Sequence, residues 1–144
     1  MQTEWNNKVK EILKNYRPNR MYLIKALHHL QNEHPQAYLP SDTLEQVANY
    51  FNLTKAEVYG IVTYYSMFSI KPRNKYIVRL CKSPVCYLKG SLNLLQYLEG
   101  KSQITVEFSE CLGQCDQAPV MMINDKLYTQ LTAEKIEHIL SNLT

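Results

Sequence analysis

The chain has 144 residues, of which 45% are hydrophobic and 20% are charged, and its formal net charge at pH 7 is +3. This composition is that of an ordinary globular protein, so it excludes disordered, collagen-like and coiled-coil chains. The 16 basic and 13 acidic residues are scattered without a dense basic block, so nucleic acid is not an expected partner.

Residues 1–70 are predicted to form a bundle of four short helices. Thr3 is expected to cap the first helix, which ends at residues 17–19, and the second helix ends before Pro35. The third opens at residues 40–42, and Thr54 with Glu57 has the pattern of a capping box for the fourth. The expected inward-facing residues, in chain order, are Trp5, Val9, Ile12, Leu13, Met21, Ile24, Leu27, His28, Gln31, Leu44, Val47, Ala48, Val58, Ile61, Val62 and Tyr65.

A basic, proline-containing stretch, Lys71-Pro72-Arg73-Asn74-Lys75, follows the bundle. This composition suits a linker or a turn. We therefore expect two domains, a helical bundle over residues 1–70 and a second domain over residues 76–144.

The second domain is predicted to alternate strands and helices. Residues 76–80, ending at Cys81, and residues 104–108 are rich in residues that favour strands, and residues 120–123 and 126–128 form a hairpin. One helix is expected between Gly90 and Gly100, and another begins at Thr132; their expected buried residues are Leu92, Leu95, Leu98, Ile136, Ile139 and Leu140. A helical crossover makes the first two strands parallel and the connection right-handed. The predicted fold class is α+β, a helical bundle followed by a thioredoxin-like four-stranded sheet with flanking helices.

All four cysteines fall into two pairs, Cys81 with Cys86 and Cys111 with Cys115, and each pair follows a predicted strand. The ends of neighbouring parallel strands lie side by side, so two loops can bring the four sulfurs to one place. The cysteine content is too low for a secreted disulfide scaffold, and a reducing compartment disfavours structural disulfides. Metal or redox chemistry is therefore the expected use of the thiols.

The spacing of the cysteines permits three kinds of site. A [2Fe-2S] cluster needs four thiolates, two for each iron, and a structural Zn²⁺ accepts four thiolates on similar loops. Thiol–disulfide chemistry is the third, although the usual Cys-x-x-Cys arrangement is absent. At a cluster, N–H groups of the loop that contains Gly113 would stabilise sulfur. Lys82 and Lys89 would favour the reduced form, whereas Glu110 and Asp116 would oppose it.

Several segments beyond the cysteines resemble one family. They are Leu39-Pro40, residues 58–68 (VYGIVTYYSMF), residues 86–90 (CYLKG) and residues 111–121 (CLGQCDQAPVM). Over most of its length the chain resembles the thioredoxin-like [2Fe-2S] subunits of NADH:quinone oxidoreductase. Similar subunits occur in NAD-linked hydrogenases, formate dehydrogenases and electron-bifurcating complexes.

The resemblance implies a function and a set of site residues. Cys81, Cys86, Cys111 and Cys115 would be the cofactor-binding residues and metal ligands of one [2Fe-2S] cluster. The chain would carry single electrons beside a larger iron–sulfur subunit that binds FMN and NAD(H), within a complex of further subunits, and would have no catalytic residue of its own. A zinc-stabilised protein-interaction module is the alternative. Ser83-Pro84-Val85, where the family often has glycine and threonine, and a shortened stretch over residues 99–110 favour by analogy a soluble NAD-linked or bifurcating complex.

Other features carry less information. The four glycines form no dinucleotide fingerprint, so a nucleotide or flavin is expected only on a partner. With no signal-like N-terminus and no apolar run of about 20 residues, we expect a cytoplasmic protein without membrane insertion. His28, His29 and His34 lack the neighbours of a recognised metal site and receive no role. The peptide bond before Pro119 is compatible with either isomer.

Overall fold

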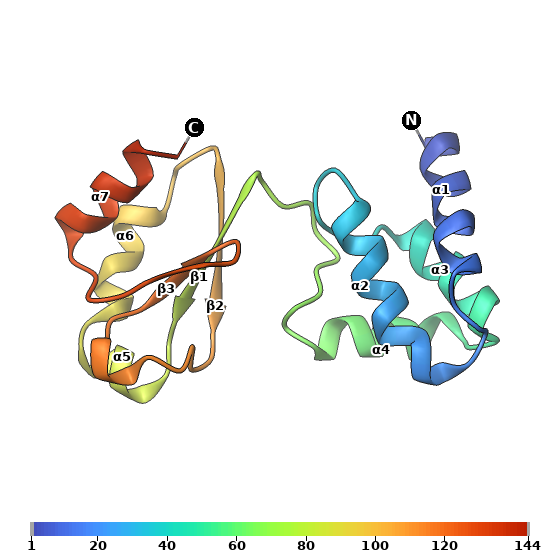
Figure 1. Cartoon of the computed structure of the whole chain (residues 1–144), viewed down its shortest axis with the longest axis horizontal. Helices are drawn as coiled ribbons and strands as arrows, with labels where there is room; N and C mark the ends of the chain where they lie inside the picture. The colour runs from blue at the N-terminus through green and yellow to red at the C-terminus, as the bar shows by residue number, and fades with distance from the viewer. Residues whose placement is uncertain (1, 144) are drawn as a thin grey trace. The chain divides into compact units, whose positions relative to one another are not determined.

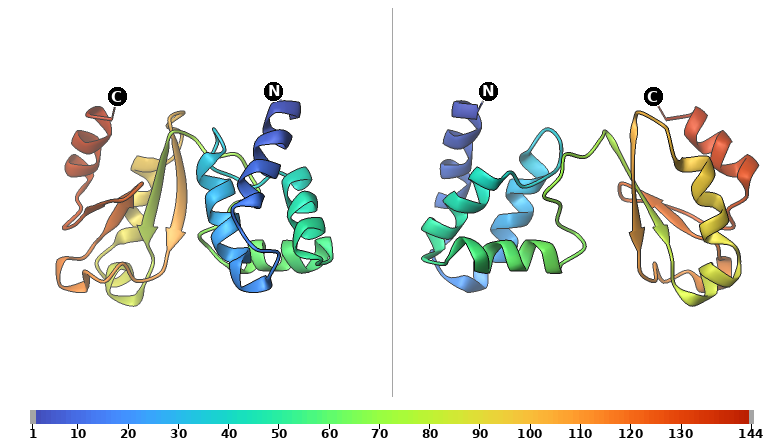
Figure 2. Two further views of the ribbon diagram at one scale, coloured as in Figure 1. Left: turned by 45° about the vertical axis from the view of Figure 1, so that its right-hand side comes forward. Right: turned by 180° about the vertical axis from the view of Figure 1, so that it is seen from behind.

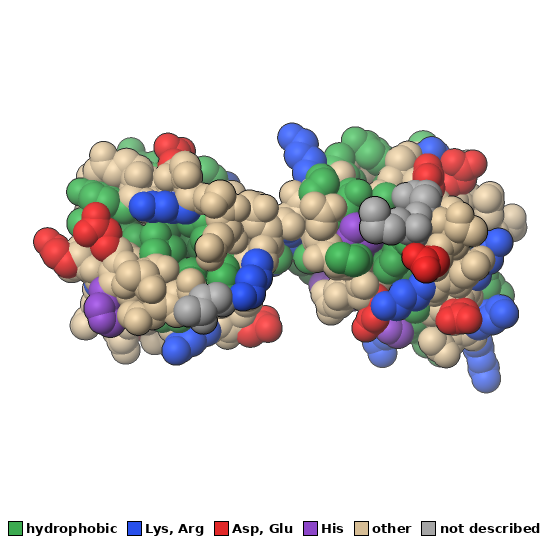
Figure 3. Space-filling view, turned by 90° about the horizontal axis from the view of Figure 1, so that it is seen from above, with side chains coloured by type: hydrophobic (Ala, Val, Ile, Leu, Met, Phe, Trp, Pro, Cys, Tyr) green, Lys and Arg blue, Asp and Glu red, His purple; other side chains and the backbone are tan. Residues whose placement is uncertain are grey.

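The computed structural model describes residues 2–143 and divides the chain into two compact units, one ending at Arg73 and one beginning at Asn74. The first unit is helical, and the second combines a sheet with helices (Figure 1). Acidic and basic side chains are interspersed on the face of each unit that Figure 3 shows, in agreement with the scattered charges of the sequence. No helix among the described residues has the length and apolar character needed to cross a bilayer.

The elements of the first unit are α1 (Gln2–Lys14), the 3-10 turn η1 (Arg20–Tyr22), α2 (Leu23–Glu33), α3 (Ser41–Phe51) and α4 (Lys55–Tyr64). The predicted capping box of α4 is confirmed. The Thr54 hydroxyl accepts a hydrogen bond from the Glu57 N–H, and the Glu57 carboxylate accepts one from the Thr54 N–H. Two of the backbone donors that a helix start leaves free are thereby satisfied.

Two predictions for the first two helices are wrong. Thr3 lies inside α1, which already begins at Gln2, so Thr3 does not cap it. In α2, Leu27 and Gln31 are buried as predicted, but Met21 is 74% exposed and Ile24 is 37% exposed. Met21 belongs to η1, whose tighter winding changes the phase of the buried face. The face that packs inward is Leu23, Ala26, Leu27, Leu30 and Gln31.

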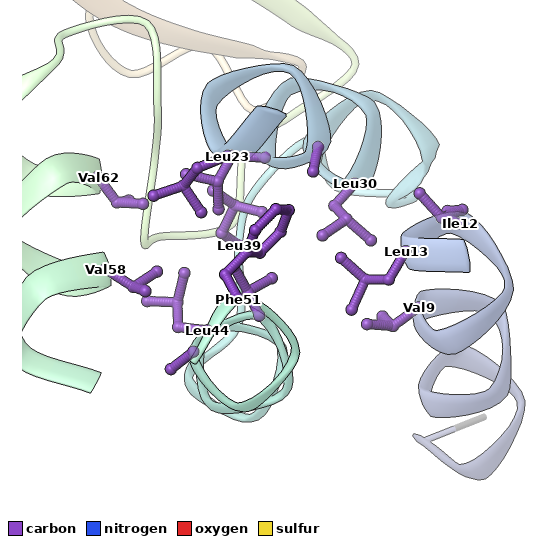
Figure 4. Packing of buried hydrophobic residues seen from close by; sticks show 14 of the residues in the cluster. Val9, Ile12, Leu13, Leu23, Leu30, Leu39, Leu44, Phe51, Val58 and Val62 are labelled. Carbon is purple, nitrogen blue, oxygen red and sulfur yellow. The ribbon is translucent and has the colours of Figure 1, made fainter. Parts of the chain in front are cut away.

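Side chains from α1 to α4 point into one core (Figure 4). Val9 of α1, Leu30 of α2 and Val58 of α4 are fully buried, and Phe51 of α3 packs among them. Full burial of each large aliphatic side chain contributes roughly 1.5–3 kcal/mol of transfer free energy. Tyr65, predicted to face inward, follows α4 and is 39% exposed.

The second unit contains a four-stranded sheet of order β2-β1-β3-β4. The strands are β1 (Tyr76–Cys81), β2 (Ile104–Ser109), β3 (Met121–Ile123) and β4 (Lys126–Tyr128). Strands β1 and β2 are parallel, and β3 is antiparallel to both β1 and β4. The predicted parallel pair, hairpin and α+β fold class are confirmed.

Helices α6 (Leu95–Leu98) and α7 (Ala133–Ser141) cover one face of the sheet (Figure 2). Val78 and Leu80 point to this face because side chains two residues apart share a face of a strand. The helix predicted between Gly90 and Gly100 is only partly confirmed. Its first part is the 3-10 turn η2 (Ser91–Leu94), and Leu92 is 38% exposed.

Candidate metal centre

The two cysteine pairs follow the carboxyl ends of neighbouring parallel strands. Cys81 ends β1, and its partner in the register of β2 is Ser109. Just beyond, the Lys82 N–H donates to the Ser109 carbonyl at 2.9 Å. The register of one strand pair therefore starts both cysteine loops at the same edge of the sheet, as the sequence predicts.

The first pair is held by a short helix that the sequence did not indicate, α5 (Pro84–Leu88). Pro84 stands at its start, where a missing N–H costs no hydrogen bond. Cys81 and Cys86 are each 1% exposed and pack with Val120. These two sulfurs therefore lie on the apolar side of the site.

The second pair lies in the loop after β2. The sulfurs of Cys111 and Cys115 are 3.2 Å apart; Cys111 is exposed, and Cys115 opens the 3-10 turn η3 (Cys115–Gln117). The Gly113 N–H points to the Cys111 sulfur at an N–S distance of 3.4 Å. Gly113 has a φ of +80°, which glycine adopts without the strain that a Cβ brings. The expected N–H support from this loop is present.

Polar contacts connect the two loops around Cys81. The Ser83 hydroxyl oxygen lies 3.2 Å from the Cys81 sulfur in a buried contact. The backbone N–H of Leu112, from the opposite loop, also supports the Cys81 sulfur. Groups from both cysteine loops therefore stabilise the thiolate form of Cys81 and lower its pKa.

The two thiols of each pair have opposite pKa shifts. Burial alone raises the pKa of Cys81, but hydrogen bonds from Ser83, Cys86 and Leu112 together outweigh it and the net pKa is lowered. Burial and the contact with Cys81 raise the pKa of Cys86. The Gly113 N–H, helped by Cys115, lowers the pKa of Cys111, and the contact with Cys111 raises the pKa of Cys115. Two thiolates at such short range repel, so full ionisation of a pair requires a compensating cation.

The donor set fits an iron–sulfur group. Four thiols with nearby N–H and O–H donors form a soft ligand set, and a [2Fe-2S] cluster takes two thiolates at each iron. Within residues 2–143, no group of three or more His, Cys, Asp or Glu side chains is already arranged to hold a metal ion. The cysteines form two pairs: Cys81 and Cys86 pack in one buried cluster, and the sulfurs of Cys111 and Cys115 are 3.2 Å apart.

Two of the histidines that received no role in the site pack against aromatic rings of the helical unit. His28 packs on Phe68 with ring centroids 4.8 Å apart, and His34 contacts Trp5 and Tyr38 in edge-on geometry. The Ala118–Pro119 peptide bond is cis.

Ser83 lies beside the Cys81 sulfur and was not singled out from the sequence. The available signal was a serine at the start of a helix, two residues after a cysteine.

Comparisons with known proteins agree on one family. Residues 9–144 match the family model described as thioredoxin-like [2Fe-2S] ferredoxin. A component of the NADH-quinone oxidoreductase of Rickettsia felis is 33% identical, over 93% of this chain and 87% of that protein. The HndA component of the NADP-reducing hydrogenase of Solidesulfovibrio fructosivorans is 27% identical, over 83% of this chain and 75% of that protein.

A solved structure has a similar fold. The NAD+-reducing [NiFe]-hydrogenase in its H2-reduced state superposes with a TM-score of 0.68 and 22% sequence identity over 83% of this chain. This chain spans only 22% of the length of that hydrogenase chain. The likeness concerns the fold alone.

Proposed function

Because the chain belongs to the thioredoxin-like [2Fe-2S] ferredoxin family, we propose that it is an electron-transfer subunit of a multi-subunit oxidoreductase, of the NADH-quinone oxidoreductase or hydrogenase type. A [2Fe-2S] cluster is the cofactor of this family. A larger subunit that binds FMN and NAD(H) is the proposed partner, and hydride chemistry belongs to that subunit. The two cysteine pairs at the ends of adjoining parallel strands are the observation that carries the proposal.

Cys81, Cys86, Cys111 and Cys115 are the proposed ligands. When bound, the cluster accepts and releases one electron at a time. Cys81 and Cys86 hold it from the apolar side, where Val120 and the partly buried Leu112 and Ala118 keep water away. Cys111 and Cys115 hold it from the more exposed side. One protected side and one accessible side suit a centre that exchanges electrons with a partner.

Exposed apolar side chains flank the site and support a partner at this end of the unit. Tyr87 and Leu88 of α5 are 58% and 83% exposed, and Val85 and Leu92 are partly exposed beside them. Tyrosine and large aliphatic residues at the surface are typical of protein interfaces. We therefore place the partner subunit against α5 and η2.

Metal and spectroscopic analysis of the full chain, purified without oxygen, tests the proposal. We expect equal amounts of iron and acid-labile sulfide, visible absorption, and an electron paramagnetic resonance signal after reduction by dithionite. A colourless chain with stoichiometric zinc would falsify the cluster assignment and leave the zinc-stabilised interaction module.

Replacement of any ligand cysteine by serine should cause the protein to lose the cluster or bind it less stably. An unchanged iron content in Cys111→Ser or Cys115→Ser removes that residue from the ligand set.

The association with a partner needs its own test. Co-purification from the native host should recover a flavoprotein with this chain. Recovery of the chain alone at every salt concentration contradicts the assignment as a subunit.

One observation also fits a second function, thiol–disulfide exchange. Cys111 is exposed, has a lowered pKa and lies beside Cys115, which is the environment of a reactive thiol. Iron-free chain that turns over disulfide substrates, with activity lost in both Cys111→Ser and Cys115→Ser, would establish that function. We expect no such turnover from the cluster-loaded chain, because its thiolates are bound to iron.

A further inference from the structure

Ser83 stands at the residue that precedes α5 but does not cap this helix. A serine in this position commonly accepts a hydrogen bond from an N–H of the first turn. The Ser83 side chain makes no such bond, although its backbone carbonyl accepts the ordinary first helical hydrogen bond from the Tyr87 N–H at 2.8 Å. The side chain is 7% exposed, and its hydroxyl oxygen lies 3.2 Å from the Cys81 sulfur. The hydroxyl is therefore directed at sulfur rather than at the helix.

We propose that Ser83 is a positioning residue whose hydroxyl donates a hydrogen bond to the Cys81 sulfur and raises the reduction potential of the cluster. This inference rests on the proposed function, in which Cys81 is a ligand. A metal-bound cysteine is a thiolate without a proton, so only the hydroxyl can donate in this contact. Hydrogen bonds to the sulfurs help to set the potential of an iron–sulfur cluster. Reduction adds negative charge, so a donor at sulfur stabilises the reduced form more than the oxidised form.

The remaining contacts make the contribution of this hydroxyl separable. Backbone N–H groups of Ser83 and Leu112 also support the Cys81 sulfur, and neither is removed by Ser83→Ala. Ser83→Ala also removes no capping hydrogen bond from α5, because the Ser83 side chain makes none. Ser83→Ala should therefore retain the cluster while removing one donor from one ligand.

The chain offers a matched control in Ser91. Ser91 is 0% exposed, it belongs to the same unit, and its hydroxyl has no hydrogen-bond partner among the described residues. Ser91→Ala removes a buried hydroxyl without breaking a hydrogen bond. Ser83→Thr is the conservative variant, because it keeps the hydroxyl.

The test is a redox titration of cluster-loaded full chains, followed by electron paramagnetic resonance. In Ser83→Ala we expect the equilibrium constant for one-electron reduction to fall roughly tenfold, which is a shift of about 59 mV to more negative potential. Ser83→Thr should restore most of this shift, and Ser91→Ala should not move the potential. A Ser83→Ala potential equal to that of the wild type, or an equal shift in Ser91→Ala, overturns the inference.

A measurement on the wild type covers the case in which Ser83→Ala does not hold its cluster. After a brief exchange into heavy water, long enough for a hydroxyl proton but not for hydrogen-bonded backbone N–H groups, the paramagnetic reduced wild type should show a deuteron coupled to the cluster that is retained in Ser83→Thr. Absence of this fast-exchanging deuteron coupling in the loaded wild type overturns the inference alone. Absence of a cluster from the wild type overturns the proposed function, and this inference with it.

Discussion

The Lys82 ammonium lies 3.1 Å from the Glu110 carboxylate and joins the two loops that carry the cysteines. Lys82 follows Cys81, and Glu110 precedes Cys111. Both side chains are solvent-accessible, so the pair contributes no more than about 1 kcal/mol to folding. The ion pair matters more for the charge near the cluster. Lys82 is expected to favour the reduced form and Glu110 to oppose it, so in the ion pair their opposite charges largely cancel.

Two variants that each remove one of these charges should therefore shift the reduction potential of the cluster in opposite directions. Lys82→Gln leaves the Glu110 charge uncompensated and should lower the reduction potential, whereas Glu110→Gln should raise it. Both shifts should shrink with added salt, because these charges are exposed and screened. Lys101→Gln, before the opposite end of β2, is the control and should have little effect. Shifts of the same sign in the two loop variants, measured by redox titration, contradict this explanation.

The conformation of Gly113 gives a prediction about cluster retention. Gly113 and Gly100 have φ values of +80° and +77°. Apart from the two adjacent residues, an added Cβ would meet no atom of residues 2–143 within 4 Å at either position. Alanine at either position should cost about 1–2 kcal/mol through backbone strain alone. Of these two glycines, Gly113 donates its N–H to a cysteine sulfur, so Gly113→Ala should hasten loss of the cluster and Gly100→Ala should not. Thermal unfolding and the decay of visible absorbance under a chelator separate the two effects. Equal decay in both variants would show that the loop conformation does not hold the site.

The position of the cysteine pairs was predictable from the sequence, because it depends only on where two strands end and on the parallel pairing of those strands. Strand-favouring residues such as Ile77 and Val78 identify β1, and the parallel pairing with β2 brings the ends of the two strands together. Helix α5 was missed because its five residues are too few to show helical periodicity. The face of α2 was partly wrong because the sequence does not reveal that the chain enters this helix through η1.

The orientation of Ser83 could not be predicted for a different reason. Sequence position offers its hydroxyl a local partner, the first turn of α5, and the tertiary fold offers another, the Cys81 sulfur. The choice between them depends on where β1 ends relative to the helix. Local pattern contains no information about that distance.

The capping box gives a prediction about acid stability. The Thr54 N–H and hydroxyl, with a smaller effect from Arg20, hold the pKa of Glu57 below its ordinary value. A lowered folded-state pKa contributes stability above the unfolded-state pKa, and this stability is lost as the pH falls toward the folded-state value. Glu57→Gln should therefore unfold at a lower temperature than the wild type near neutral pH, and the difference should disappear in acid.

Two further variants control this measurement. Thr54→Ala should cost roughly 0.5–2 kcal/mol, as the loss of an N-terminal cap usually does. Glu11→Gln removes an exposed carboxylate of α1 and is the control for the loss of one negative charge from the helical unit. A difference between Glu57→Gln and the wild type that persists in acid would mean that the carboxylate charge is not what stabilises α4.

The two-domain organisation that we propose predicts an independent cluster-binding fragment. All four cysteines belong to the unit that begins at Asn74, and so does the core built from Val78, Leu80, Leu98, Met121 and Ile136. A fragment of residues 74–144 should therefore fold and hold a [2Fe-2S] cluster.

Core variants test each unit separately. Leu80→Ala should lower the free energy of unfolding by about 2–5 kcal/mol and abolish folding of the fragment, because a domain of this size has little stability to spare. In the full chain, Leu27→Ala should weaken the helical unit and leave the cluster spectrum intact. Circular dichroism and visible absorption check both expectations. A fragment that gains its cluster only when residues 1–73 are added back contradicts two independent domains.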